Sequence, residues 1–214
     1  MPYPAGHRER VRERIVDSAR RLFNRNGFDG VSVNAIMADA GLTRGAFYSY
    51  FDGKSDLYVE VLGCFFTDPN FRSRWEGVEV DLASAEAGPQ IVRAYLSRQH
   101  FENVENSCPM VALPGDVARS DAPVKAAFEK VFRGMVSVLA REVKGKARRR
   151  EDAAMAIAAL CVGGMVVARS MSDERFADRL RDAATRIALE LGGWRRGAVR
   201  KGRGRRAKSA GAGR

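Results

Sequence analysis

The segment "NAIMADAGLTRGAFYSYFDGKSDLY", residues 34–58, contains two short helical patterns separated by a single glycine. Gly41 can adopt the positive φ that a tight turn between two helices needs. Apolar residues on both sides of this turn can form one small core between crossed helices: Ile36, Ala40, Leu42, Phe47 and Tyr50. The pattern predicts a helix-turn-helix.

The second helix of this pair carries the residue types that read DNA. A helix that begins at Arg44 and runs to about Phe51 can place its first residues on base edges in the major groove. Arg44 suits a guanine edge or a phosphate, while Gly45 and Ala46 keep the helix surface low, and Ala46 can touch a thymine methyl group. Thr43 can cap the helix and donate to a phosphate.

Residues on either side of this helix complete the expected interface. Ser32 is the expected N-cap of the preceding helix, Tyr48 and Tyr50 offer hydroxyls at the groove wall, and Lys54 adds a cation beside the free N–H groups of the next helix. We therefore predict eight DNA-binding residues: Ser32, Thr43, Arg44, Gly45, Ala46, Tyr48, Tyr50 and Lys54.

The longer segment "GFDGVSVNAIMADAGLTRGAFYSYFDGKSDLY" resembles the DNA-binding domain of the TetR family of bacterial transcriptional repressors. The shared pattern is an Ala-Gly turn, then Thr-Arg-Gly, Tyr-x-x-Phe and Lys-x-x-Leu, within roughly the first 60 residues. Two positions depart from the family pattern: Met37 stands where a small residue is usual, and Val31 replaces a Thr that could contact a phosphate.

The resemblance implies an all-α fold. A three-helix DNA-binding domain is expected in residues 1–53, a larger helical effector-binding and dimerisation domain in residues 54–194, and a basic tail in residues 195–214. It also implies a homodimer on a palindromic double-stranded operator, released by a small-molecule effector. The two recognition helices would then lie about 34 to 36 Å apart, in successive major grooves.

In this family the last two helices pair across the dimer. The segment "EDAAMAIAALCVGGMVVARS", residues 151–170, is apolar nearly all round, so we expect it to be covered on more than one side. Two adjacent glycines in it indicate the close approach of another helix. The expected interface residues are Ala156, Leu160, Gly163, Gly164, Val167, Leu180 and Ile187.

The other expected helices follow from apolar periodicity and from caps. We predict one helix from Ile91 to about Val104 after a linker at residues 76–90, a short helix from Pro109, and a long one opened by Asp121. The final helix has an apolar stripe at Phe176, Leu180, Ala183, Ile187 and Leu191.

Aromatic and sulfur-containing side chains of the larger domain are candidates for lining an effector pocket. The alternative is that each simply packs in the core, since an aromatic at helical spacing usually does; one large apolar pocket is the general expectation. The candidates are Phe65, Phe66, Trp75, Tyr95, Phe101, Met110, Phe128, Phe132 and Met135.

Cys108 is a separate candidate, because it precedes Pro109 at a helix start, where the helix dipole can lower the pKa of a thiol. Its surroundings, "NSCPMVALPGDVARSD", are similar to the stretch in family members that sense electrophiles through a cysteine. The alternative is a pocket or structural cysteine. Cys64 and Cys161 are expected to be inert packing.

The net charge of +11 is concentrated at the end of the chain. Residues 195–214 contain nine Lys or Arg and no acid, which leaves 28 basic against 26 acidic residues elsewhere. The tail could strengthen DNA binding by releasing counterions, or it could be a solvated extension with little role. A nonspecific architectural DNA-binding protein is therefore one alternative function.

Other classes of protein find little support in the sequence. Three cysteines and two histidines show no metal-ligand spacing, so we expect no metal and no cofactor; His100 is either a ligand contact or an ordinary exposed or capped histidine. An enzyme that uses the larger domain's cavity is an alternative, yet no catalytic constellation is recognisable. The uncharged run at residues 153–168 is too short for a membrane span, and we expect a cytoplasmic protein.

Overall fold

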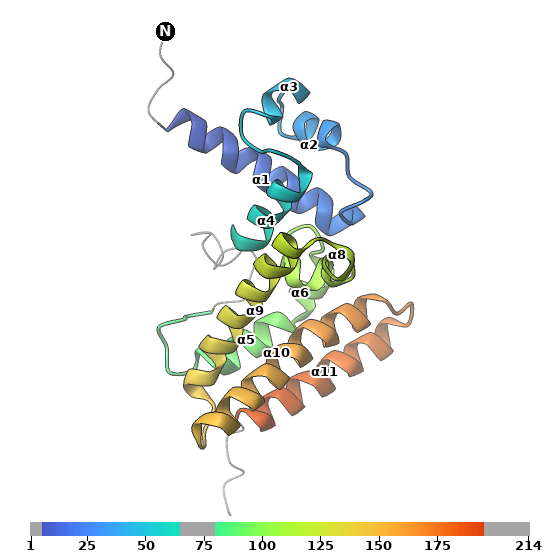
Figure 1. Ribbon diagram of the computed structural model, residues 1–214. Helices are drawn as coiled ribbons and strands as arrows, with labels where there is room; N and C mark the ends of the chain where they lie inside the picture. The colour runs from blue at the N-terminus through green and yellow to red at the C-terminus, as the bar shows by residue number, and fades with distance from the viewer. Residues whose placement is uncertain (1–5, 65–79, 195–214) are drawn as a thin grey trace, which may run out of the picture.

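The computed structural model describes residues 6–64 and 80–194, and within these ranges it contains helices and no strand (Figure 1). The predicted all-α fold is confirmed. The helices are α1 (His7–Asn26), α2 (Val33–Asp39), α3 (Arg44–Phe47), α4 (Lys54–Cys64), α5 (Ala87–Tyr95), α6 (Arg98–Glu102), α7 (Pro109–Ala112), α8 (Pro114–Arg119), α9 (Ala122–Glu142), α10 (Ala147–Arg169) and α11 (Glu174–Leu191).

Helix α1 organises the upper part of the molecule in Figure 1. Its large apolar residues recur every three to four positions, so one face is buried, with Ile15 and Phe23 fully inside. Gly27, at φ 73°, ends the helix. The same core takes in Leu57 and Tyr58 of α4; α2 and α4 both pack against α1, and α3 packs on α2.

The turn between α2 and α3 forms as predicted. Gly41 has φ 66°, and the N–H groups of Gly41 and Leu42 donate to the carbonyls of Ala38 and Met37 at 3.0 and 2.8 Å. This pair of bonds satisfies carbonyls that the helix end would leave unpaired. Leu42 is thereby turned back toward the core that contains Ile36 and Phe47.

The second core lies under α5, α9, α10 and α11. The single helix predicted from Ile91 to Val104 is wrong: α5 begins earlier, at Ala87, and α6 is a separate helix. The break has a polar cause, because the Ser97 hydroxyl accepts the N–H of His100 at 3.1 Å and so caps a new helix.

Prolines divide the next segment into short helices. Pro109 and Pro114 each stand in the first turn of a helix, where a missing N–H costs nothing. The short helix expected from Pro109 is therefore α7 alone, and α8 follows as a separate turn. Asp121 caps α9 as predicted, accepting the N–H of Val124 at 3.3 Å.

Helix α10 is covered by α9 and α11 and also contacts α5, α6 and α7, as its nearly uniform apolar surface predicted. The expected close approach occurs at Gly164, where an added Cβ would lie 3.1 Å from the Cβ of Ala184 in α11. Gly163 has no such neighbour in a single chain, since an added Cβ there would have no neighbour within 4 Å among the described residues.

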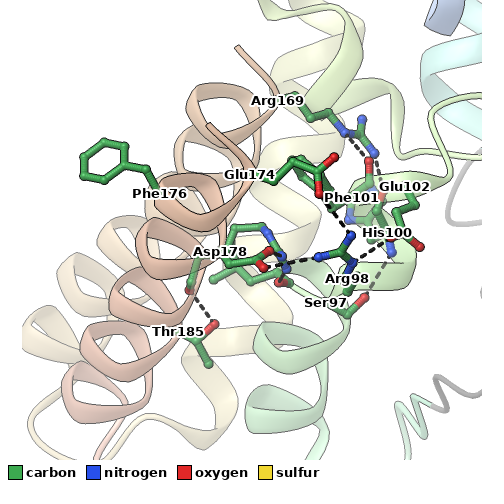
Figure 2. A network of polar contacts seen from close by, with 12 residues as sticks. Ser97, Arg98, His100, Phe101, Glu102, Arg169, Glu174, Phe176, Asp178 and Thr185 are labelled. Atoms are coloured by element: carbon green, nitrogen blue, oxygen red, sulfur yellow. Dashed lines mark hydrogen bonds and ion pairs between the residues drawn. The ribbon is translucent and has the colours of Figure 1, made fainter. Parts of the chain in front are cut away.

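The apolar stripe of α11 faces away from the core. Three alanines and Arg181 line the buried side of this helix, with Ala177, Ala184 and Ala188 inside, while Phe176, Ile187 and Leu191 are 43 to 48% exposed. Figure 2 shows the ring of Phe176 extending away from the neighbouring polar network. A single chain therefore leaves uncovered the face that its sequence marks as most apolar.

Among the described helices, α10 is long and apolar enough to cross a membrane by length and composition. This finding is weak evidence for a membrane protein, because the core helix of a soluble protein passes the same test. Here α10 packs against α9 and α11.

Candidate nucleic-acid interface

Helix α3 lies at the outer edge of the upper part of the molecule (Figure 1). Arg44 and Gly45 are exposed and Ala46 is half-buried, while Phe47 turns fully inward. Tyr48 is 61% exposed, and its ring lies edge-on against Phe47, 5.3 Å between centroids. The helix thus presents its first turn to solvent and anchors itself through one buried aromatic side chain.

The recognition helix is shorter than predicted. It ends at Phe47, and Tyr48 to Tyr50 form turns before the chain reaches Phe51. Two arginines of α1 donate hydrogen bonds to carbonyls of this segment. Arg8 donates to the carbonyl of Ser49 and Arg12 to the carbonyl of Tyr50, each at 2.7 Å. Those contacts hold the backbone in its turn instead of a continuing helix.

Arg8 and Arg12 therefore position the recognition segment, a role that the sequence reasoning missed. Arg12 also binds Glu60 of α4 through two nitrogens, which raises the pKa of the guanidinium, and it lies over the ring of Phe51 at 4.4 Å. Arg8 lies over the ring of Tyr50 at 5.5 Å. Helical spacing places these arginines outside the core, but it does not predict which backbone carbonyls they bind.

Four of the predicted residues gather around one shallow hollow. It has a volume of about 330 Å³ and is lined by Ser32, Val33, Asn34, Arg44, Tyr48 and Lys54. Asn34 was not predicted, although its amide lies on the exposed side of the first turn of α2. Hydroxyl, amide and guanidinium groups therefore converge where α2 and α3 meet, which is a donor set suited to phosphate oxygens and base edges.

Lys54 differs from its predicted role as a free cation at a helix start. Its ammonium donates to the carbonyls of Phe28 and Val31 at 2.8 and 3.0 Å and lies 4.1 Å from the centre of the Phe28 ring. Lys54 therefore fixes the loop before α2, while remaining on the wall of the hollow.

The two caps behave differently. Ser32 accepts the N–H of Ala35 at 3.1 Å, as predicted. Thr43 occupies the N-cap position of α3 in extended conformation, but its side chain makes no capping hydrogen bond, so this part of the prediction is wrong. The Thr43 side chain is exposed.

The packing also accounts for the two departures from the family pattern. Val31 is 3% exposed and Met37 is fully buried, so both side chains serve the core. Gly45 has the opposite environment, because an added Cβ would meet no atom within 4 Å. Nothing in the described part of the chain therefore requires a glycine at this position.

The DNA-side helix α1 is bound to the larger core through one loop, residues 103–108. Arg20, 3% exposed, donates to the carbonyl of Glu105 at 2.7 Å and to the side chain of Asn106 at 3.1 Å. Asn24 donates to the carbonyls of Glu105 and Ser107 at 3.0 and 2.9 Å. Two buried side chains of α1 thus fix the backbone position of this loop.

The other side of the same loop is held by a buried histidine (Figure 2). His100 lies 2.6 Å from the carbonyl of Tyr95 through Nδ1 and 2.9 Å from the Ser107 hydroxyl through Nε2. Since a carbonyl only accepts, Nδ1 carries the proton, and Nε2 accepts from Ser107 and from the N–H of Cys108 at 3.3 Å. Burial lowers the pKa of His100 to about 3, so the ring is neutral.

His100 is therefore neither exposed nor a simple helix cap, contrary to expectation. Arg169 of α10 completes the cluster by donating to the Ser107 hydroxyl at 2.8 Å and to the carbonyl of Phe101 at 3.2 Å. Burial lowers the pKa of Arg169 to about 10, which leaves it charged at neutral pH. The loop is thus clamped between α1 and α10.

The predicted effector residues separate into distinct environments. Tyr95, Met110 and Cys108 are buried together in the second core, and Met135 belongs to the same cluster. Phe101 and Phe128 are partly buried against it, whereas Phe132 lines an open groove of about 770 Å³ between α9 and α10. Phe65, Phe66 and Trp75 lie outside the described residues.

The two buried thiols have a tyrosine hydroxyl as neighbour. Burial, with the nearby Cys108 and Cys161 thiols, raises the pKa of Tyr95 well above its usual value. Burial also raises the pKa of Cys161 to about 12, which agrees with the expectation of an inert thiol. Cys108 is buried at the start of α7 and is not in a disulfide.

In residues 6–64 and 80–194, no group of three His, Cys, Asp or Glu side chains comes together in a way that could hold a metal ion.

Comparison with known proteins agrees with this geometry. The family model described as "Bacterial regulatory proteins, tetR family" matches residues 15–61, from α1 to α4. The HTH-type transcriptional regulator SrpR of Pseudomonas putida is 33% identical over 94 residues, which cover 40% of this chain and 44% of SrpR. TtgW, another HTH-type transcriptional regulator of Pseudomonas putida, is 32% identical over 94 residues, covering 40% of this chain and 70% of TtgW.

The likeness in fold extends beyond the matched segment. The crystal structure of reduced E. coli NemR has a TM-score of 0.66 with this chain, at 19% identity, and the alignment covers 85% of this chain and 96% of NemR. At this identity the likeness concerns the fold alone. The fold of NemR therefore extends over most of this chain, while the family-model match is confined to residues 15–61.

Proposed function

Because the chain belongs to the TetR family of bacterial regulatory proteins, we propose that it is a cytoplasmic transcriptional repressor that binds a palindromic operator as a homodimer and leaves it when an effector binds. The observation that carries the proposal is the exposed first turn of α3, where Arg44, Gly45 and Tyr48 face solvent beside the donors of α2. In this proposal Arg44 contacts a base or a phosphate and the hollow receives the DNA backbone.

The uncovered face of α10 and α11 supports a homodimer. Val167 of α10 is 45% exposed, and Phe176 and Ile187 of α11 are 48 and 43% exposed. The predicted contacts Ala156, Leu160, Gly163 and Leu180 are exposed or half-buried on the same two helices. Gly164 is the exception, since it faces Ala184 inside the chain. Burying such a face against a second copy removes apolar surface from water on both chains.

The clamped loop supports an effector response. A ligand that favours a different position of residues 103–108 would change the bonds that Arg20 and Asn24 make to Glu105, and hence the orientation of α1. Such a ligand acts only through its different affinities for the two states. Helix α4 extends the coupling, because it packs against both α1 and α9.

Cys108 is the proposed point of attack of a thiol-reactive effector. It starts α7, which contacts both α1 and α10. Addition of the S–H group across the double bond of an electrophile would attach new atoms to a side chain that is now fully buried. The original packing could not reform around the adduct, so the loop would have to move.

The first test is a binding selection on random duplex DNA with the purified protein at about 150 mM salt, where exposed phosphate contacts are strongly screened. Recovery of a palindrome is the expected result. Recovery of no preferred sequence would overturn the repressor proposal and favour a nonspecific DNA binder.

Arg44→Ala then tests the docking. Loss of a base or phosphate contact should weaken operator binding by about 1 to 3 kcal/mol, with the thermal stability unchanged. Arg93→Ala is the matched control, because Arg93 is an exposed arginine on α5. Equal operator affinity of the Arg44 variant and the wild type would show that α3 does not face the DNA as proposed.

The sensor role is tested with N-ethylmaleimide. Treatment should release the operator from the wild type and from Cys161→Ser, but not from Cys108→Ser. Release from the Cys108 variant at the wild-type rate would assign the reaction to another thiol, and no release from the wild type would remove the electrophile from the proposal.

A further inference from the structure

The turn between α9 and α10 carries a dense group of unpaired positive charges, which we call the basic tip. Residues 141–150 contain six Lys or Arg and a single acid, Glu142. Five of the six basic side chains are exposed and Arg150 is half-buried. The basic tip consists of Arg141, Lys144, Lys146, Arg148, Arg149 and Arg150.

These charges have no structural use among the described residues. None of the six side chains makes a hydrogen bond or ion pair with another described residue. Several other arginines of the described chain are paired: Arg12 with Glu60, Arg98 with Glu102, and Arg181 with Asp178. The single acid of the tip is engaged elsewhere, since Glu142 accepts the N–H of Gly88 at 2.8 Å.

The basic tip lies at the end of the molecule opposite to α3 (Figure 1). Helix α9 joins the two ends: Val124, in its first turn, belongs to the core of α1, and Val143, just after its end, belongs to the second core. Its 21 residues span about 30 Å at 1.5 Å per residue. A straight duplex lying across α3 therefore leaves the basic tip free.

The last described residues reach the same end. The indole of Trp194 donates to the carbonyl of Glu142 at 3.2 Å, and an added Cβ at Gly193 would lie 3.7 Å from the side chain of Lys144. Gly193 and Trp194 therefore lie against the basic tip.

We propose that the basic tip is a second nucleic-acid site, which holds the phosphate backbone of another double-stranded DNA segment without regard to its sequence. Together with α3, this site lets one operator-bound dimer bridge two DNA segments. The bridging part rests on the proposed function, whereas binding of DNA at the tip does not. Phosphate contacts of this kind release counterions and are strongly salt-dependent.

The composition of the tip favours DNA over a membrane surface. Interfacial binding to lipid needs large apolar side chains beside the positive ones. The exposed residues between positions 141 and 150 are Lys, Arg, Gly and Ala, and the one large apolar side chain there, Val143, is 3% exposed. A protein already bound to DNA also meets neighbouring segments at high effective concentration.

The test uses the full chain attached to beads through its N-terminus and saturated with unlabelled operator, followed by a labelled, unrelated duplex of about 30 base pairs, long enough for several phosphate contacts. The tip variant is Lys144→Gln, Lys146→Gln and Arg148→Gln. The matched control is Arg93→Gln, Lys125→Gln and Lys130→Gln, which removes the same number of exposed Lys and Arg away from the tip.

The wild type and the control should capture the labelled duplex equally, and the tip variant should capture it at least about fivefold less, since each lost phosphate contact lowers the salt slope by about 0.9. Operator affinity should be the same in all three. Equal capture by the tip variant and the control would overturn the proposal, as would binding of anionic vesicles that depends on the tip while duplex capture does not.

Failure of the repressor proposal is distinguishable from failure of this one. If no operator exists, the competitor is omitted, and the tip and control variants are compared on the same labelled duplex. A difference between them then supports the tip site alone. Arg44→Ala provides the reverse comparison, because it should lose operator affinity while capturing the unrelated duplex as the wild type does.

Discussion

Helices α1 and α11 are both amphipathic, yet the large apolar side chains of α1 face the core of the chain and those of α11 face solvent. In α1, Ile15 and Phe23 are fully buried. In α11, the buried apolar residues are alanines, while Phe176, Ile187 and Leu191 are exposed by 43 to 48%. An apolar stripe therefore predicts that a face will be covered, and it does not say whether the same chain covers it.

The difference follows from the neighbours of each helix. Helix α1 packs on α2 and α4, which supply aromatic partners such as Tyr58, 5.3 Å from Phe23 between ring centroids. Helix α11 approaches α10 so closely that only small residues fit between them, as at Gly164 and Ala184. Close packing on the side that faces α10 leaves the larger residues of α11 exposed on the other side.

The largest expected effect is a change of oligomeric state when the exposed apolar stripe of α11 is altered. Ile187→Asp should convert the proposed dimer to monomers at micromolar concentration, because two carboxylates would be buried without partners at a cost of several kcal/mol each. Light scattering coupled to gel filtration measures the mass, and helical content by circular dichroism should stay unchanged. Arg186→Asp is the control, because Arg186 is exposed and lies outside the apolar stripe of α11. This variant should remain dimeric.

The matching change in α1 should affect stability and leave the oligomeric state alone. Phe23→Ala removes a fully buried ring that contacts Phe28 and Tyr58, and should lower the free energy of unfolding by about 3 to 5 kcal/mol. Denaturant unfolding measures the loss. A monomeric Phe23 variant, or a dimeric Ile187→Asp, would break the contrast between the two helices.

The pH dependence of stability tests the buried polar cluster around His100, in contrast to the apolar core around α1. The pKa of His100 is about 3 when folded, below its ordinary value of 6.5, so only the unfolded chain binds this proton between those values. Stability should therefore fall by about 2 kcal/mol from pH 7 to pH 5. In His100→Asn this part of the slope should vanish, and an identical slope in both proteins would show that His100 is accessible to protons when folded.

The smallest effects come from the two adjacent glycines of α10. Gly164→Ala places a Cβ 3.1 Å from Ala184 and 3.2 Å from the buried Leu96, and should cost about 1 kcal/mol after the gain in helix propensity. Gly163→Ala meets no atom within 4 Å and should stabilise a monomer by up to about 1 kcal/mol. Measuring both in the monomeric Ile187→Asp background isolates the chain from its partner.

Gly163→Ala also tests the proposed dimer interface. If the partner's helix lies against this position, the added methyl should weaken dimerisation even though it stabilises the single chain. Unchanged or tighter dimerisation would place the two-fold contact elsewhere along α10.

The helix-turn-helix was predictable because its determinants are local. Positive φ at Gly41, the cap at Ser32 and the spacing of Ile36, Leu42 and Phe47 each involve residues close in sequence. The exposure of Arg44 and Tyr48 follows from the same spacing. The role of Asn34 could have been found from its place in the first turn of α2, beside Ser32.

Contacts made by long polar side chains were not predictable in the same way. Lys54 binds two carbonyls of the loop before α2, and Arg8 and Arg12 bind carbonyls beyond α3. These partners are 23 to 41 positions away along the chain. Local pattern places such residues outside the core and leaves their partners undetermined.

The sequence by itself determined the helical fold, the recognition turn and the family, because these depend on periodicity, on caps and on one glycine. Only the tertiary structure decided that α11 turns its large residues outward, that His100 is buried and neutral, and that α1 and α10 share one loop. The physical reason is that burial and pKa depend on contacts between segments that are distant in sequence, and a local sequence pattern does not specify those contacts.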